Sequence, residues 1–138
     1  MLSIVYLLLV HCKESRMLPQ ADVDQVFKLD RFIVPVAARD EFVARTRAIR
    51  DFLQTLDGYV ENLLLERPGA DGTINIVTVA RWRDAAAFER ARAAAAERYR
   101  ATGFNPAELI KRLGISADMG NYTPLMEEQT LATSDSNS

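Results

Sequence analysis

INIVTVARWRDAAAF, residues 74–88, carries the strongest local signals in the chain. Its first half is rich in β-branched residues and ends at Trp82, a composition typical of a strand. Asp84 can cap the open amides of a following helix, because it precedes a run rich in alanine. Apolar residues occupy both alternating sets of strand positions, with Arg81 on the set opposite to Trp82. Both faces of the strand are therefore expected to be buried, one of them by a second copy of the chain.

Length and composition indicate one ordinary globular domain. The chain has 138 residues, of which 49% are hydrophobic and 26% are charged. Its formal net charge of -2 offers no field that would attract nucleic acid or an anionic membrane, so neither partner is expected. Cys12 is the only cysteine, which rules out an internal disulfide and makes a cytoplasmic location the simplest prediction.

The two ends of the chain differ from the segment between them. Residues 1–24 are predicted to form an N-terminal arm or, in their first part, to be an over-extended start that precedes Met17. The apolar run at residues 2–10 is about half as long as a membrane-spanning helix, and it lacks the preceding positive charge of a secretory signal. Residues 25–126 are assigned to one domain, and the polar residues 127–138 to a disordered tail.

Periodicity divides the domain into strands and helices. The expected strands cover residues 26–34, 59–67, 73–82 and 115–125. The expected helices cover residues 42–56, 85–102 and 106–113, and they are ended by Gly58, Gly103 and Gly114. Two right-handed strand-helix-strand units in this order predict a ferredoxin-like βαββαβ fold of the α+β class. Its four-stranded antiparallel sheet would have the first and third strands at the centre and both long helices on one face.

RNA-recognition domains share this order of strands and helices. They carry exposed aromatic side chains and a basic-glycine-aromatic motif on the third strand. Residues 76–79 of this chain read IVTV at that place, so RNA binding is not expected.

Six residues at the ends of the second and third strands form a pattern. They are Gly58 and Tyr59 where the second strand opens, Trp82, Arg83 and Asp84 at the end of the third, and Phe88 one turn into the helix. Over residues 26–125 this pattern resembles the antibiotic biosynthesis monooxygenase family of dimeric α+β barrels. The resemblance implies a homodimer whose sheets pack together, with a pocket in each subunit between sheet and helices. Some members oxygenate polycyclic aromatic substrates with molecular oxygen and without metal or flavin, whereas others degrade haem.

No cofactor and no metal are expected. Haem-degrading relatives bind iron through a histidine near the second helix, whereas the only histidine of this chain is His11, outside the domain. One histidine and one cysteine cannot build a transition-metal site. The sequence also lacks a glycine-rich phosphate loop and a dinucleotide fingerprint, so a bound nicotinamide or flavin is not predicted.

The resemblance therefore favours a cofactor-independent monooxygenase that acts on a small aromatic phenol or quinol. In such chemistry the substrate anion reduces oxygen, and the protein supplies orientation, a proton acceptor and a cation or amide that stabilises the developing charge. Trp82 matches a position of the family motif, whereas Asn62 and Arg81 are proposed as catalytic residues from their places on the strands. Four further residues are candidates for substrate binding: Arg31, Tyr59, Tyr99 and Phe88.

Each candidate also has a purely structural explanation. Trp82 can be a core or dimer-interface residue, and Tyr99 can serve helix packing. Arg31 can form an ion pair with Asp30, and Asn62 can face solvent. The alternative function is accordingly a non-catalytic dimeric barrel that binds a small hydrophobic ligand.

Overall fold

The computed structural model describes residues 23–126, so the predicted arm up to residue 22 and the tail 127–138 lie outside the described residues. The strands are β1 (Val26–Pro35), β2 (Tyr59–Pro68), β3 (Thr73–Trp82) and β4 (Ser116–Tyr122). The helices are α2 (Arg39–Leu53), α3 (Ala85–Thr102) and α4 (Pro106–Arg112), and a short 3-10 turn, η2 (Val36–Ala38), joins β1 to α2. The order of elements is the predicted one, with β4 shorter at both ends than expected.

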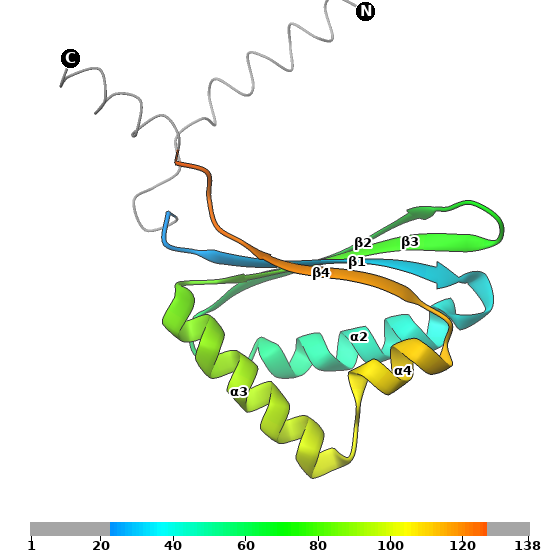
Figure 1. The fold of residues 1–138 in the computed structure, drawn as a ribbon. Coiled ribbons are helices and arrows are strands. Elements are labelled where there is room, and N and C mark those ends of the chain that lie inside the picture. Colours follow the sequence, from blue (N-terminus) through cyan, green and yellow to red (C-terminus); the bar gives the residue numbers. More distant parts are fainter. Residues whose placement is uncertain (1–22, 127–138) are drawn as a thin grey trace, which may run out of the picture.

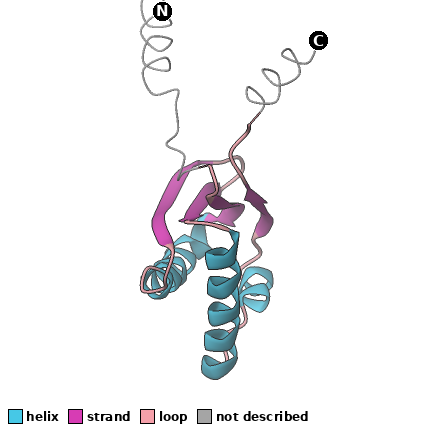
Figure 2. Ribbon diagram, turned by 90° about the vertical axis from the view of Figure 1, so that its left-hand side faces the viewer, coloured by secondary structure: helices cyan, strands magenta, loops and turns pink. Residues whose placement is uncertain are grey.

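The strands form one antiparallel sheet in the order β2-β3-β1-β4, with β1 and β3 at the centre as predicted. The helices α2, α3 and α4 all lie on one face of this sheet (Figure 1). A view turned by 90° shows the same two layers, with the sheet above the helices (Figure 2). The predicted ferredoxin-like α+β fold is confirmed.

Alternate side chains of the strands face the helices or the open side of the sheet. On β3, Ile76, Ala80 and Trp82 face the helices and are buried. Val77 and Val79 point to the open side and are partly buried. Large apolar side chains from the other strands lie on the same open side and are 41% to 51% exposed; they are Ile33, Leu63, Leu65 and Tyr122.

Helix α2 ends earlier than the sequence suggested. Its last residue is Leu53, and Gln54 follows with right-handed backbone angles, so Gly58 is not its cap. The backbone amides that follow bond three residues back, in tighter turns than those of an α-helix. Gly58 does have the predicted left-handed conformation, with a φ of 87°, but it lies in the turn that enters β2. Its carbonyl accepts a hydrogen bond of 2.8 Å from the amide of Arg83.

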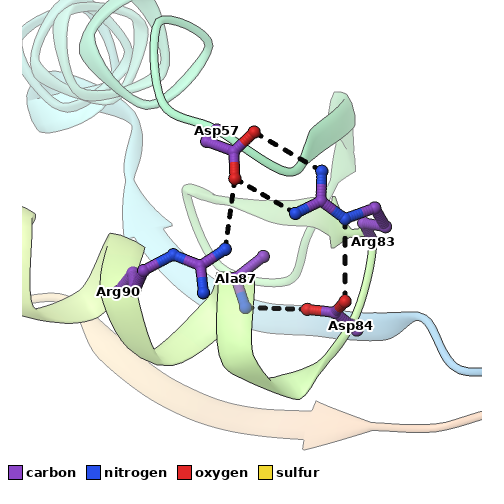
Figure 3. A network of polar contacts seen from close by, with 5 residues as sticks. All are labelled: Asp57, Arg83, Asp84, Ala87 and Arg90. Atoms are coloured by element: carbon purple, nitrogen blue, oxygen red, sulfur yellow. Dashed lines mark hydrogen bonds and ion pairs between the residues drawn. The ribbon is translucent and has the colours of Figure 1, made fainter.

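A polar network joins this turn to the start of α3 (Figure 3). Asp57 accepts hydrogen bonds from Arg83 and Arg90, each at 3.1 Å. Asp84 caps α3 as predicted, because its side chain accepts a hydrogen bond of 2.8 Å from the amide of Ala87. The network therefore fixes the end of β3 against the first turn of α3.

Two separate clusters of buried side chains form the core between sheet and helices. One contains Phe32 and Phe42, whose rings meet edge to face at 4.9 Å. The other contains Trp82 and Phe88. Members of both clusters line one cavity, which occupies the middle of the helix-facing side of the sheet.

Candidate functional site

A cavity of about 370 Å³ lies between the sheet and the helices. Its floor is β3, where Thr78 and Ala80 leave space because their side chains are small. Its walls are mainly apolar side chains from the three helices, among them Ile49, Leu53, Ala91, Ala95, Leu109 and Ile110. The volume falls within the range of small-molecule binding sites. The structure thus contains the kind of pocket that the resemblance implied.

Trp82, the last residue of β3, lines this cavity. Its side chain is almost completely buried, at 2% exposure, and it lines the cavity together with Phe88. The ring of Tyr59 meets the indole edge to face at 5.8 Å. Tyr59 itself does not line the cavity; it pairs with Trp82 across β2 and β3 and packs beside the indole rather than contacting a ligand.

Tyr99 reaches the cavity from α3. Its ring meets that of Phe104 edge to face at 5.4 Å, and both residues line the cavity. Burial raises the pKa of the Tyr99 hydroxyl above its ordinary value of 10. The phenol is therefore protonated at neutral pH and can donate a hydrogen bond.

Asn62 lies on β2 and faces the cavity rather than solvent. Its Oδ1 atom is buried and has no hydrogen-bond partner among residues 23–126. Buried polar atoms are normally paired, so an unpaired amide oxygen at a cavity wall indicates a place where a ligand can donate a hydrogen bond.

An ion pair between Lys28 and Asp30 also faces the cavity. The prediction that Asp30 pairs with Arg31 is wrong, because neighbouring residues of a strand point to opposite faces. The Lys28–Asp30 pair was not among the residues predicted for the site. The signal was present, since both residues alternate with the apolar positions that cover the open side of β1.

The structure does not bring Arg31 and Arg81 to the cavity. Both lie on the open side of the sheet, because Arg81 alternates with Trp82 on β3 and Arg31 pairs with Val77. Arg81 bonds to Gln25 at 2.8 Å and lies 5.1 Å from the centre of the Phe27 ring. This geometry supports neither the catalytic role predicted for Arg81 nor substrate binding by Arg31 within the cavity.

Three arginines that were not predicted for the site also line the cavity: Arg45 and Arg50 from α2, and Arg92 from α3. Arg92 bonds to Glu89 at 3.0 Å, and the guanidinium of Arg45 lies 4.9 Å from the centre of the Phe104 ring. Their positions beside the apolar stripes of the two helices could have identified them. They add positive charge to the wall of the cavity.

No family model matches the sequence, and no curated protein matches it. Several solved structures are similar to the chain. A putative monooxygenase from Shewanella loihica PV-4 is 22% identical, with 74% of this chain and 95% of that chain covered and a TM-score of 0.56. A dimeric ferredoxin-like protein from an uncultured marine organism is 11% identical, with 74% and 96% covered and a TM-score of 0.57. The chain shares their fold.

A putative antibiotic biosynthesis monooxygenase from Bacillus cereus is also similar, at 14% identity, with 74% of this chain and 94% of that chain covered and a TM-score of 0.51. The resemblance to this family seen in the sequence is thereby confirmed as a likeness of fold.

Within residues 23–126, no helix is long and apolar enough to cross a membrane. The same residues contain no group of three or more His, Cys, Asp or Glu side chains that could hold a metal ion.

Proposed function

We propose that the protein is a cofactor-independent monooxygenase of a small aromatic phenol or quinol. The observation that carries this proposal is the cavity. Its mainly apolar lining includes the buried Trp82, and it also includes Asn62, whose buried amide oxygen is unpaired. Apolar walls suit aromatic rings, and a buried amide without a partner suits a polar group on the same ligand. The occurrence of the same fold in a putative monooxygenase supports the proposal.

The proposed reaction needs no external reductant. A phenol whose ortho or para C–H becomes a carbonyl forms a quinone, with one atom of O₂ entering the ring and the other leaving as water. All electrons that reduce oxygen come from the substrate, and its two lost hydrogens leave in the water. The protein then has to orient the ring and stabilise negative charge as it develops on oxygen.

The cavity offers residues for both tasks. Trp82 provides a rigid wall for the ring, and Asn62 provides an amide that hydrogen-bonds the phenol. Lys28, paired with Asp30, supplies a cation at the cavity wall, which Arg81 does not line. Tyr99 and Phe88 contact the ligand from α3.

Oxygen uptake with a panel of naphthols, anthrones and quinols tests this function. Asn62→Leu should lower kcat/KM about 10- to 100-fold, as expected when one preorganised polar contact to the transition state is removed. Trp82→Phe should lower it about tenfold by loosening the orientation of the ring. Asn121→Leu is the matched control, because Asn121 is exposed on β4 and does not line the cavity.

A panel member that binds in the cavity without any oxygen uptake would overturn the monooxygenase proposal. The alternative of a non-catalytic barrel that binds a hydrophobic ligand would then stand in its place.

We also propose that the protein is a homodimer joined through the open side of the sheet. That side carries Leu63, Leu65, Ile33 and Tyr122, each 41% to 51% exposed, and large exposed apolar patches mark interaction surfaces. A protein of the same fold is described as dimeric. Sedimentation velocity should show a dimer for the wild type and a monomer for Leu65→Lys. Leu125→Lys is the control, because Leu125 is 82% exposed and lies outside the sheet, and a wild-type monomer at micromolar concentration would contradict the proposal.

A further inference from the structure

Two buried oxygens in the cavity lack a hydrogen-bond partner among the described residues: Asp30 Oδ1 and Asn62 Oδ1. Asp30 is only 7% exposed, and its other carboxylate oxygen accepts a hydrogen bond from Lys28 Nζ. A buried acceptor without a donor is unfavourable, and more so when it is charged. The cavity therefore presents two acceptors that a ligand with two donors would satisfy.

The register places the two acceptors on opposite sides of the cavity floor. Asn62 on β2 and Lys28 on β1 both pair with Ala80. Asp30, two residues farther along β1, pairs with Thr78. Strands lie about 4.8 Å apart and two residues of a strand rise about 6.7 Å, so the Cα atoms of Asn62 and Asp30 are about 12 Å apart. Side chains on one face of a sheet stand roughly parallel to one another, so the two hydrogen bonds, about 2.8 Å each, take up about half of this distance. The remainder matches hydroxyl groups at opposite ends of one ring or of two fused rings.

We propose that Asp30 and Asn62 together select an aromatic ligand with hydroxyl groups at two opposite positions, and that Lys28 holds Asp30 in the orientation that receives one of them. This inference rests on the proposed function for the aromatic character of the ligand. A carboxylate only accepts hydrogen bonds, so a methyl ether or a ketone at that position leaves it unpaired, whereas a hydroxyl satisfies it. A hydrogen bond to a carboxylate also makes the ring more electron-rich, which favours electron transfer to oxygen.

A series of naphthalenes with the same ring system tests the selection in the wild-type protein. Binding is measured by fluorescence titration under argon with naphthalene-2,6-diol, 2-naphthol and 2,6-dimethoxynaphthalene. The dissociation constant should rise roughly tenfold from the diol to 2-naphthol and roughly tenfold again to the dimethoxy compound, because each step removes one charge-assisted or buried hydrogen bond. Equal affinity for the diol and the dimethoxy compound would overturn the inference.

Variants of Asp30 test the residue assignment. Asp30→Asn should weaken binding of the diol about tenfold and leave the affinity for the dimethoxy compound unchanged. Asp40→Asn is the matched control, because the Asp40 side chain is 95% exposed at the start of α2 and does not line the cavity. A diol affinity in Asp30→Asn equal to that of the wild type would overturn the assignment.

Circular dichroism and a double variant cover the case in which Asp30→Asn does not fold. If circular dichroism shows that Asp30→Asn does not fold, the double variant Lys28→Met/Asp30→Leu removes both charges together, and its diol and 2-naphthol affinities should become similar. A preserved tenfold difference in that variant would overturn the assignment. Because binding is measured without oxygen, absent turnover overturns the proposed function alone, whereas an absent hydroxyl preference overturns this inference alone.

Discussion

Gly58 is the position at which one added methyl group should most disturb the fold. Its φ of 87° is strained for any residue with a side chain, and a Cβ atom there would collide with the Cβ atom of Ala87 in the first turn of α3. Gly72 has a similar φ of 73°, but nothing lies within 4 Å of the Cβ atom that alanine would add. Alanine at these two glycines therefore separates backbone strain from steric collision.

The expected losses of stability follow from these two terms. Gly72→Ala should lower the free energy of unfolding by about 1–2 kcal/mol through the left-handed backbone alone. Gly58→Ala should lose the same amount and a further amount of about 1–3 kcal/mol for overpacking against Ala87. The total loss of about 2–5 kcal/mol is a large share of the free energy of unfolding of a typical domain, which is roughly 5–15 kcal/mol.

Urea unfolding measures both values, with the fluorescence of Trp82, the only tryptophan and 2% exposed, as the probe. Protein concentration is held constant, because association would change the apparent stability. The double variant Gly58→Ala/Ala87→Gly should recover the collision term, less about 1 kcal/mol of lost helix propensity. A Gly58→Ala variant as stable as Gly72→Ala would refute the close contact between the β2 turn and α3.

Two further predictions concern the polar network at the start of α3. Asp84→Ala removes the hydrogen bond to the amide of Ala87 and should lower the free energy of unfolding by about 1 kcal/mol, whereas Asp84→Asn, which can still cap the helix, should retain most of it. Equal losses in these two variants would contradict the capping role. Arg83, through its hydrogen bond above all, and Arg90 lower the pKa of Asp57. A lowered folded-state pKa stabilises the fold above the ordinary pKa of the carboxyl group, and this contribution disappears as pH falls through the folded-state value. Asp57→Asn should therefore be less stable than the wild type at neutral pH and lose less stability on acidification; parallel curves of urea unfolding against pH would contradict this.

Local patterns were sufficient to predict the fold. The β-branched run of β3 and the alanine-rich run of α3 each have their own periodicity, and Asp84 and Gly103 bound α3 in the structure as they do in the sequence. The central places of β1 and β3 follow from two right-handed units. Gly58 was misassigned as a helix end, because a left-handed glycine suits any sharp turn.

The candidate site was predicted only in part. Trp82 and Asn62, two of the predicted catalytic residues, line the cavity, whereas Arg31 and Arg81 do not. The alternation of strand residues already placed Arg81 on the face opposite to Trp82, so the sequence itself argued against placing both in one site. The Lys28–Asp30 pair was missed because charged residues in the middle of a central strand were expected to pair with sequence neighbours.

Periodicity, caps and turns depend on residues only a few positions apart, which is why they can be read from the chain. The contacts of a polar side chain, by contrast, depend on residues that are far apart in the sequence. Asn62 and Asp30 face one space because β3 lies between their strands and the helices cover that side of the sheet. The cavity itself exists because the small side chains of Thr78 and Ala80 lie beneath helices that do not fill the space above them, a result of packing across the whole sheet that no local pattern encodes.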